Sequence, residues 1–441
     1  MKTLCCALLG GLAFALFAGE TVVFQARDFD SPPEAAGWRP FSPRDETRPL
    51  CTVARRGGRS GSALQIASGG NLAAFGGWRT EIQGLTGGAV YQFSAWCRTT
   101  GVPLERRSVI ARLEWQDARG RQARPPDYAI DTAREGRWMR MEYTTRIPTN
   151  ATAVKLELAL AFAPNGVVWW DDVELRQLPA MPQRPVRLLT VYLRPRNTGG
   201  PAQSVEEFCR LVEAAKPPLD LVCLPEGITV IGTGKTYAEV SETVPGPTTE
   251  RLGRLAQKLR CYVVAGLYER VGHVVYNTAV LVNREGRLVG KYRKTHLPRE
   301  EWEAGITPGN EYPVFTTDFG RVGLIICYDL QFPEPSRAMA ARGAEILVLP
   351  IWGGSDVLAR ARAIENSVYL ISATYDMRSF IVDPTGAILA EATPEQPVAR
   401  ADIDLEAQFF LPWNGNMKTR TWKEWRPDLP ITPPPPDARG R

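Results

Sequence analysis

The second half of the chain alternates short, wholly apolar runs with amphipathic stretches. The clearest case is residues 321–350, RVGLIICYDLQFPEPSRAMAARGAEILVLP. Its first apolar run, which ends at Cys327, predicts a strand buried on both faces of a sheet. Pro333 stands where a first helical turn tolerates proline, Gly343 marks a helix end, and 345–349 predicts the next strand. The pattern predicts strand, turn, helix and strand in an α/β domain.

Short strands separated by turn residues fill the first half instead. Runs such as AVYQFSAWCRT, AVKLELALAF and VVWWDDVEL are bounded by Gly, Pro, Asn or Asp. In the second run Val154, Leu156 and Leu158 alternate with other residues and so share one face. This spacing predicts an all-β jelly-roll sandwich over residues 20–178. The proline-rich stretch 179–185 reads as a linker, so two domains are expected.

Three reactive side chains follow strand-like runs in the second half. Glu226 follows LDLVCLP, Lys294 ends the polar-alternating run VGKYRK, and Cys327 ends the apolar run described above. Ligands of α/β sheets bind near the carboxyl ends of strands, where these residues are expected to lie. Alone, the cysteine is most simply a buried thiol, and the glutamate and lysine are solvated strand ends. Their joint occurrence favours a catalytic role.

The segments that carry these residues resemble the three catalytic motifs of the nitrilase superfamily of carbon–nitrogen hydrolases. The matching segments are LPEG, KYRKTHLP and GLIICYDLQFPEPSRAMAARGAEILVLP, and the resemblance extends over residues 186–408. It implies a four-layer αββα sandwich and a homodimer formed through this domain. It also implies a Glu226–Lys294–Cys327 triad that requires no metal and no organic cofactor.

The chemistry implied by the resemblance is hydrolysis of a small-molecule amide or N-carbamoyl compound through a thioester. Glu226 serves as general base, while Lys294 and the backbone N–H of Tyr328 support the oxyanion. Trp352 is expected to line the pocket. Tyr328-Asp329 resembles the amidase branches, whereas nitrilases carry Trp-Glu there, so nitrile hydrolysis is the less favoured alternative.

The family often adds a second glutamate between the lysine and a proline–glycine turn. Glu300, Glu301 and Glu303 precede that turn here. Their spacing leaves the choice open, and Glu303 is favoured. His296, inside KTHLP, is expected to be structural.

Charge and composition exclude several classes of function. The net charge is +5 over 441 residues and no Lys/Arg block occurs, which argues against nucleic-acid binding. Two histidines and no CxxC pair rule out the common zinc sites. Six cysteines follow residue 6 at irregular spacing; Cys51–Cys97 is one candidate disulfide, and no pair is assigned.

The two ends of the chain carry their own signals. Residues 1–19, MKTLCCALLGGLAFALFAG, place one lysine before an apolar run that ends in small residues. This predicts a secretory signal peptide and a secreted or periplasmic protein, with an uncleaved anchor as the alternative. Residues 409–441 are proline-rich and polar, and are predicted to be an extended or disordered tail.

The predicted sandwich resembles galactose-binding-like jelly rolls of carbohydrate-binding modules, through YQFSAWCRT and VVWWDDVEL. The resemblance implies a polysaccharide partner held by exposed aromatics. The candidates are Trp96, Trp115, Trp169 and Trp170. Core positions for these tryptophans are the favoured alternative, and Asp171-Asp172 reads as a turn or a structural calcium site. A rival function follows: a non-catalytic secreted protein that binds glycans or surfaces.

Overall fold

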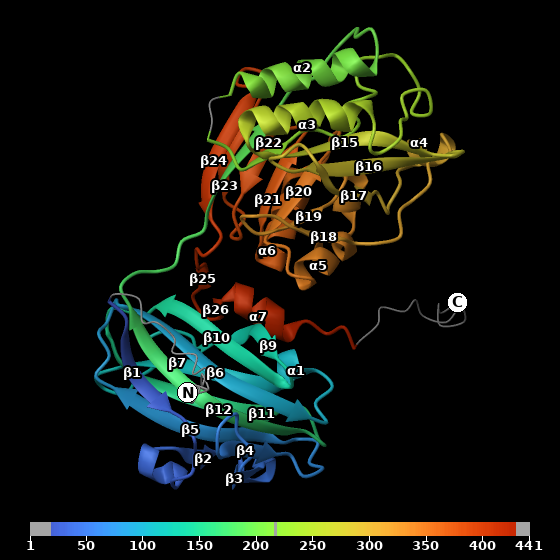
Figure 1. Cartoon of the computed structure of the whole chain (residues 1–441). Coiled ribbons are helices and arrows are strands. Elements are labelled where there is room, and N and C mark those ends of the chain that lie inside the picture. Colours follow the sequence, from blue (N-terminus) through green and yellow to red (C-terminus); the bar gives the residue numbers. More distant parts are fainter. Residues whose placement is uncertain (1–18, 216–217, 429–441) are drawn as a thin grey trace, which may run out of the picture. The chain divides into compact units, whose positions relative to one another are not determined.

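The computed structural model describes residues 19–215 and 218–428, which form two compact units (Figure 1). The first, the β unit, runs to Met181 and includes Leu411–Gly415; the second, the α/β unit, comprises Pro182–Phe410 and the chain from Asn416. The predicted signal peptide, apart from its last residue, and the proline-rich end of the tail lie outside the described residues. Across the described part of the chain, no helix has the length and apolar character needed to cross a membrane.

The β unit consists of two antiparallel sheets around one core. One sheet has the order β3-β4-β12-β6-β10-β9, with β1 also paired to β12, and the other has the order β2-β5-β11-β7-β8. The strands are β1 (Thr21–Ala26), β2 (Arg39–Phe41), β3 (Leu50–Ala54), β4 (Ala63–Ala67), β5 (Phe75–Gln83), β6 (Val90–Thr100), β7 (Val109–Asp117), β8 (Asp127–Tyr128), β9 (Ile130–Glu135), β10 (Trp138–Arg146), β11 (Ala151–Ala161) and β12 (Val167–Leu178). The predicted alternation in β11 is confirmed, because Val154, Leu156 and Leu158 are buried in this core.

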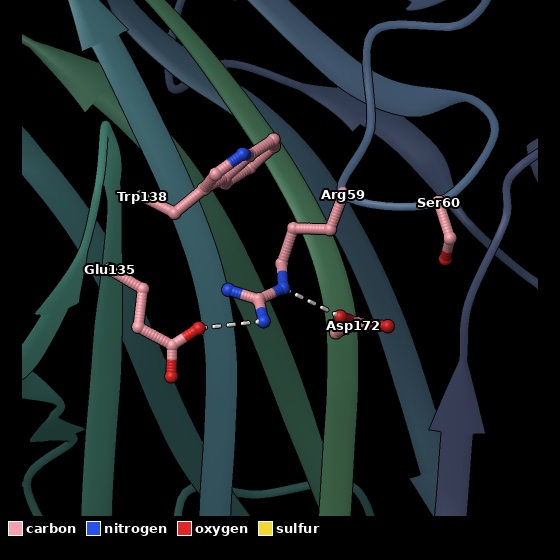
Figure 2. A pocket seen from close by; sticks show the side chains of 5 residues that line it. All are labelled: Arg59, Ser60, Glu135, Trp138 and Asp172. Atoms are coloured by element: carbon pink, nitrogen blue, oxygen red, sulfur yellow. Dashed lines mark hydrogen bonds and ion pairs between the residues drawn. The ribbon is translucent and has the colours of Figure 1, made fainter. Parts of the chain in front are cut away.

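The four tryptophans considered as sugar platforms divide into two pairs. Trp115 and Trp170 are fully buried in the core, so neither is an exposed platform. Trp96 and Trp169 lie on the opposite face of their sheet, where guanidinium groups cover them. Arg59 lies 3.8 Å from the Trp96 ring centre and Arg98 lies 3.8 Å from that of Trp169. Figure 2 shows Arg59 extended between two carboxylates at the edge of this face.

The α/β unit contains two six-stranded sheets, ordered β17-β16-β15-β14-β13-β24 and β18-β19-β20-β21-β22-β23. The strands are β13 (Pro185–Val191), β14 (Leu221–Cys223), β15 (Tyr262–Val271), β16 (Val274–Val282), β17 (Leu288–Arg293), β18 (Val314–Thr316), β19 (Arg321–Leu324), β20 (Ile346–Pro350), β21 (Tyr369–Ala373), β22 (Ser379–Val382), β23 (Ile388–Ala392) and β24 (Val398–Asp404).

Helices cover the outer faces of both sheets (Figure 1). Helices α2 (Pro201–Glu213) and α3 (Pro247–Leu259) pack on the first sheet, and α5 (Pro333–Ala341) and α6 (Asp356–Asn366) pack on the second. Apolar residues of the two sheets meet in a shared core between them. The four layers confirm the predicted αββα arrangement, including the strand, turn and helix predicted across 321–350.

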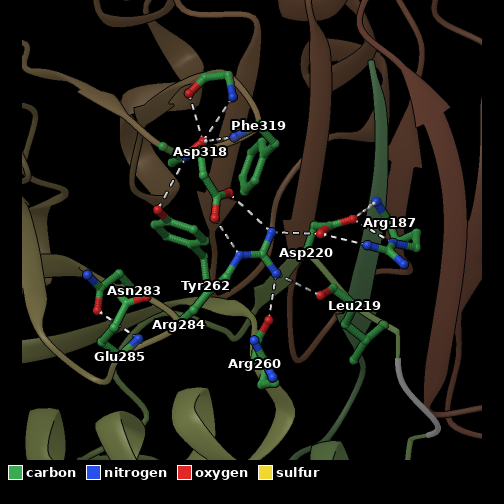
Figure 3. Close-up of polar contacts among 12 residues, drawn as sticks. Arg187, Leu219, Asp220, Arg260, Tyr262, Asn283, Arg284, Glu285, Asp318 and Phe319 are labelled. Atoms are coloured by element: carbon green, nitrogen blue, oxygen red, sulfur yellow. Dashed lines mark hydrogen bonds and ion pairs between the residues drawn. The ribbon is translucent and has the colours of Figure 1, made fainter. Parts of the chain in front are cut away.

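A polar network joins the two sheets at the amino end of β14 (Figure 3). The Arg284 guanidinium donates to Asp220 and Asp318, each at 2.7 Å. Asp220 also accepts from Arg187 at 2.6 Å. Asp220 precedes β14 in the first sheet and Asp318 precedes β19 in the second, so these ion pairs fix one end of the sandwich. The opposite end of β14 carries Glu226.

One prediction about this chain is wrong, and one candidate pairing is settled. The tail is not extended throughout, because Met417–Glu424 forms helix α7, whose first turn is capped when Asn416 accepts from the Lys418 N–H at 3.0 Å. The candidate disulfide Cys51–Cys97, which the sequence left unassigned, is not formed. The strands of these two cysteines, β3 and β6, are separated by β4 and β12, which puts them roughly 14 Å apart, well beyond disulfide reach.

Candidate active site

The three residues predicted from the motifs come together at one end of the α/β sandwich. Glu226 follows β14, Lys294 follows β17 and Cys327 follows β19. The first two strands belong to one sheet and the third to the other. The chain passes closely here: a Cβ on Gly266 of β15 would lie only 2.6 Å from the Glu226 Cα, so this position requires glycine.

The Glu226 carboxylate is the centre of the site. Its Oε1 accepts from the Lys294 Nζ at 2.9 Å and from the Asn277 amide at 2.6 Å. Its Oε2 accepts from the Trp352 N–H at 3.0 Å, and its charge acts on the neighbouring Cys327 thiol. Glu226 is 3% exposed. Three hydrogen-bond donors therefore hold the carboxylate in one orientation near the thiol, out of contact with bulk water.

Lys294 contacts a second carboxylate, that of Glu301. The Lys294 Nζ lies 3.0 Å from Glu301 Oε2, and Glu301 is buried. The expectation of Glu303 is wrong, because that side chain is 64% exposed and pairs with Arg299. Both glutamates lie in the short helix α4 (Arg299–Glu303), where residues two apart point about 200° away from each other.

Asn277, which the motifs did not single out, connects the two carboxylates. Its amide nitrogen donates to Glu226 at 2.6 Å and to Glu301 at 2.5 Å, and the side chain is fully buried. Its backbone carbonyl also accepts from the Lys294 N–H at 2.9 Å. One signal was available: Asn277 interrupts the apolar run VVYNTAVLV, and a buried asparagine needs partners.

Cys327 lies at a sharp bend. Its φ is +44°, a left-handed conformation that costs a non-glycine residue about 1–3 kcal/mol. A single 3-10 turn, Cys327–Gln331, follows, and the Tyr328 N–H belongs to its first residues, which have no partner within the turn. The Tyr328 ring is 37% exposed. The bend thus presents the thiol together with a backbone donor.

Asp329 ties this bend to the lysine segment. Its Oδ2 accepts from the Ile326 N–H at 3.0 Å and from the Tyr292 hydroxyl at 2.8 Å. Its Oδ1 accepts from the Thr295 hydroxyl and from the His296 N–H, both at 3.0 Å. The His296 ring also contacts Asp329 and stacks on Phe332, which fits the structural role expected of it. A fully buried carboxylate therefore fixes the Cys327 bend relative to Lys294.

Burial and charge set the protonation states of the site. Burial, together with the Glu226 charge, raises the pKa of the Cys327 thiol, and the nearby Lys294 only partly offsets this. Burial lowers the pKa of Lys294, but Glu226, Cys327 and Glu301 outweigh it, and the net shift is upward. Burial also raises the pKa of Glu301. The resting site therefore contains a protonated thiol beside a charged ammonium group.

No cluster of three or more His, Cys, Asp or Glu side chains within residues 19–215 and 218–428 is arranged to hold a metal ion. The polar groups at the site instead bind one another. What the arrangement can do chemically is remove a thiol proton and stabilise a negative oxygen.

Comparison with known proteins assigns the α/β unit to a family. A family profile described as carbon-nitrogen hydrolase matches residues 186–408, which is 223 of 441 residues and so more than half of the chain. The chain belongs to the carbon–nitrogen hydrolase family. It is similar to enzymes that cleave carbon–nitrogen bonds other than peptide bonds.

Relatives with assigned names include omega-amidases. Omega-amidase NIT2 of Xenopus tropicalis is 32% identical over 235 residues, which cover 46% of this chain and 84% of the relative. Omega-amidase NIT2 of Homo sapiens is 32% identical over 232 residues, with the same two coverages. A carbon-nitrogen hydrolase of Helicobacter pylori G27 is 26% identical, covers 51% of this chain and 90% of its own, and superposes with a TM-score of 0.43.

Proposed function

We propose that this protein hydrolyses the carbon–nitrogen bond of a small-molecule amide, with Cys327 as nucleophile, Glu226 as general base and Lys294 as electrostatic partner. One observation carries the proposal: the buried Glu226 carboxylate accepts from the Lys294 ammonium at 2.9 Å while its charge acts on the neighbouring Cys327 thiol. The omega-amidase relatives and Tyr328-Asp329 after the nucleophile support an amide or N-carbamoyl substrate over a nitrile.

The first half-reaction forms a thioester. Glu226 takes the thiol proton as the Cys327 sulfur attacks the carbonyl carbon, and a tetrahedral oxyanion forms. The carbon–nitrogen bond then breaks as Glu226 returns the proton to the leaving nitrogen, which departs as ammonia or an amine. Because the resting thiol is protonated, proton transfer and attack are expected to occur together rather than through a stored thiolate.

The second half-reaction releases the acid. Glu226 removes a proton from water as the water oxygen attacks the thioester, and the proton returns to the Cys327 sulfur when it leaves. Lys294 and the Tyr328 N–H are the donors for the oxyanion in both halves. One such donor is typically worth about 3 kcal/mol of transition-state stabilisation.

Glu301 and Asn277 act through the lysine and the base. Two carboxylates around one ammonium keep Lys294 charged despite burial. Asn277 donates to both carboxylates, and so holds Glu226 and Glu301 apart at a defined separation. Neither side chain is assigned contact with the reacting atoms, and both are positioning residues.

The remaining expectations about the whole protein are also proposals. We propose export to the periplasm or the exterior, on the basis of residues 1–19. We propose a homodimer formed through the α/β unit, which light scattering on a size-exclusion column tests. We propose that the β unit contacts a polysaccharide, which places an exported enzyme near its substrate.

Amide and nitrile substrates, assayed with a thioester trap, test the proposed reaction. Wild-type protein is incubated with short primary amides, N-carbamoyl compounds and the matching nitriles while ammonia is measured. Hydroxylamine is added to capture the acyl group as a hydroxamate. Ammonia and hydroxamate from amides, both lost in Cys327→Ser, are the expected results. Ammonia from nitriles alone contradicts the proposal, and inactivity on every substrate favours the non-catalytic alternative.

A further inference from the structure

The β unit carries an open cavity of about 410 Å³, whose lining residues are drawn in Figure 2. It is lined by Arg59, Ser60, Glu135, Trp138 and Asp172. Its volume falls within the range of roughly 300–1,000 Å³ that is usual for small-ligand sites. The lining residues come from three separate regions of the chain: the β3–β4 loop, the β9–β10 hairpin and β12.

The cavity lies where two strands part. Strand β4 pairs with β12 up to Trp170, whereas β1 pairs with the same edge of β12 from Val173 onward. Asp172 lies in the gap, at an irregularity of the β12–β6 pairing, with a left-handed φ of +48°. Irregularities of this kind redirect a side chain, and here the redirected side chain lines the cavity.

The β3–β4 loop, which forms one side of the cavity, is fixed by hydrogen bonds to the rest of the β unit. The fully buried Asp171 carboxylate accepts from the Arg59 N–H at 2.7 Å and from the Asp172 N–H at 2.8 Å. The Ser60 hydroxyl donates to Asp28 at 2.6 Å. Because backbone and side-chain bonds fix the loop, the cavity is formed before any ligand arrives.

The charges that face the cavity are already balanced among themselves. The Arg59 guanidinium lies 3.0 Å from Glu135 and 3.1 Å from Asp172 (Figure 2). Arg27, 3.8 Å from Asp172, is a second guanidinium beside the two carboxylates, so the charges balance. A neutral ligand is therefore favoured over an ionic one. The same groups suit hydroxyls well, because the carboxylates accept hydrogen bonds while the guanidinium and the Ser60 hydroxyl donate them.

An indole completes the lining. Trp138 is 8% exposed and borders the cavity beside the Arg59 guanidinium (Figure 2). Arginines lie 3.8 Å from the ring centres of Trp96 and Trp169, whereas Arg98 lies 5.6 Å from that of Trp138. Trp115 and Trp170 are in the core. An aromatic surface beside paired carboxylates suits a ligand that has a C–H face and a rim of hydroxyls.

We propose that this cavity binds one neutral sugar unit of a glycan, with Glu135 and Asp172 accepting from hydroxyls and Trp138 contacting the ring. This cavity would be the place where the β unit binds the polysaccharide proposed above, and the inference rests on that part of the proposal. It moves the recognition site from the four tryptophans expected from the sequence to a cavity whose indole, Trp138, was not among them.

Direct binding measurements on the full chain test the site. Tryptophan fluorescence and calorimetry are followed as neutral hexoses, pentoses and deoxyhexoses are added, each as monosaccharide and as oligosaccharide. Uronic-acid and amino-sugar oligosaccharides are the charged comparisons. Glu135→Gln, Asp172→Asn and Trp138→Phe preserve shape, and Glu81→Gln, exposed on β5 of the other sheet, is the matched control.

The expected result is saturable binding of a neutral saccharide, weakened at least about ten-fold by Glu135→Gln and Asp172→Asn and unchanged by Glu81→Gln. Trp138→Phe should abolish the fluorescence change. Three outcomes overturn the proposal: no neutral saccharide binds at millimolar concentration, only charged saccharides bind, or the three cavity variants bind like wild type. Ammonia release by the same preparations is measured in parallel, so failure of the sugar site and failure of amide hydrolysis are told apart.

Discussion

Two ion pairs of nearly equal length sit in opposite surroundings in this molecule. Lys294 and Glu226 meet at 2.9 Å with exposed fractions of 1% and 4%. Arg59 and Glu135 meet at 3.0 Å in the β unit, but Glu135 is 62% exposed. Breaking a buried pair typically costs about 3–5 kcal/mol, whereas an exposed pair contributes about 0–1 kcal/mol. Distance alone therefore does not identify a pair on which fold and chemistry depend.

The difference also separates two kinds of site. Around Lys294 the two carboxylates and the Asn277 amide nitrogen bind one another, which fixes a single arrangement before substrate binds. Around Arg59 the groups face open space and can exchange partners with a ligand. The first arrangement suits bond cleavage, which needs fixed geometry, and the second suits reversible recognition.

Of the variants that test the difference between the buried and the exposed ion pair, Glu226→Gln is expected to lower activity most. The amide keeps the shape but cannot take the thiol proton, so ammonia release should slow by about 10²–10⁴-fold. Glu81→Gln is the activity control. In urea unfolding, Glu135→Gln should change the free energy by less than about 1 kcal/mol. A Glu226→Gln enzyme that keeps a tenth of wild-type kcat would contradict the role assigned to this carboxylate.

A smaller loss is expected when the second carboxylate is neutralised. Glu301→Gln removes one of the charges that hold Lys294, and kcat should fall about 10–100-fold, as for loss of a hydrogen bond to a charged group. Glu303→Gln, two residues away and exposed, should behave as wild type. Steady-state kinetics on one amide suffices. Equal effects of the two variants would remove the distinction drawn between them.

Asp329→Asn tests positioning of the nucleophile. The asparagine keeps one acceptor oxygen. Its NH₂ group replaces an oxygen that accepts hydrogen bonds, such as those from the Tyr292 hydroxyl and the Ile326 N–H, and cannot accept them. We expect kcat to fall about ten-fold with KM little changed, and Cys327 to react more slowly with iodoacetamide. Asp318→Asn, at an exposed ion pair, is the control. Loss of stability without a change in either rate would reduce Asp329 to a structural residue.

The pH dependence is the mildest test. Because burial and then Glu226 raise the pKa of Cys327, its alkylation rate in the free enzyme should keep rising to pH 9.5 without a plateau. Stability should depend on pH as well. Above about pH 8.5 the unfolded chain loses the thiol proton that the folded chain retains, so the free energy of unfolding falls as pH rises. Cys327→Ala should make that slope shallower without abolishing it, because burial also raises the pKa values of Cys51, Cys209, Cys223 and Cys261. A plateau below pH 8 would indicate a stored thiolate.

Local patterns in the sequence were sufficient for much of the fold and for placing Glu226, Lys294 and Cys327 just after strands. Cys327 ends an apolar run and precedes Pro333 by six residues, so the bend between strand and helix could be predicted from the local sequence. Glu226 and Lys294 likewise follow strands whose apolar or alternating character is local. The alternation of such runs predicted sheets covered by helices, and the family resemblance implied the specific four-layer order.

The remaining features depend on contacts that local patterns do not encode. Choosing Glu301 over Glu303 requires the direction in which a one-turn helix faces. Asn277 meets Glu226 across 51 residues of sequence. The coverage of Trp96 by Arg59 depends on a loop held by Asp171. Each case needs the three-dimensional position of a partner that is distant in the chain.

Intact-mass analysis of the reacting enzyme tests the central claim most directly. Wild type, Cys327→Ala and Cys223→Ala are mixed with a short amide, quenched in acid within one turnover and weighed; Cys223 is a fully buried thiol outside the site. We expect a mass increase equal to the acyl group in wild type and Cys223→Ala, mapped by peptide sequencing to Cys327 and absent from Cys327→Ala. Ammonia release by Cys327→Ala at the wild-type rate, or an acyl group on another residue, would contradict it.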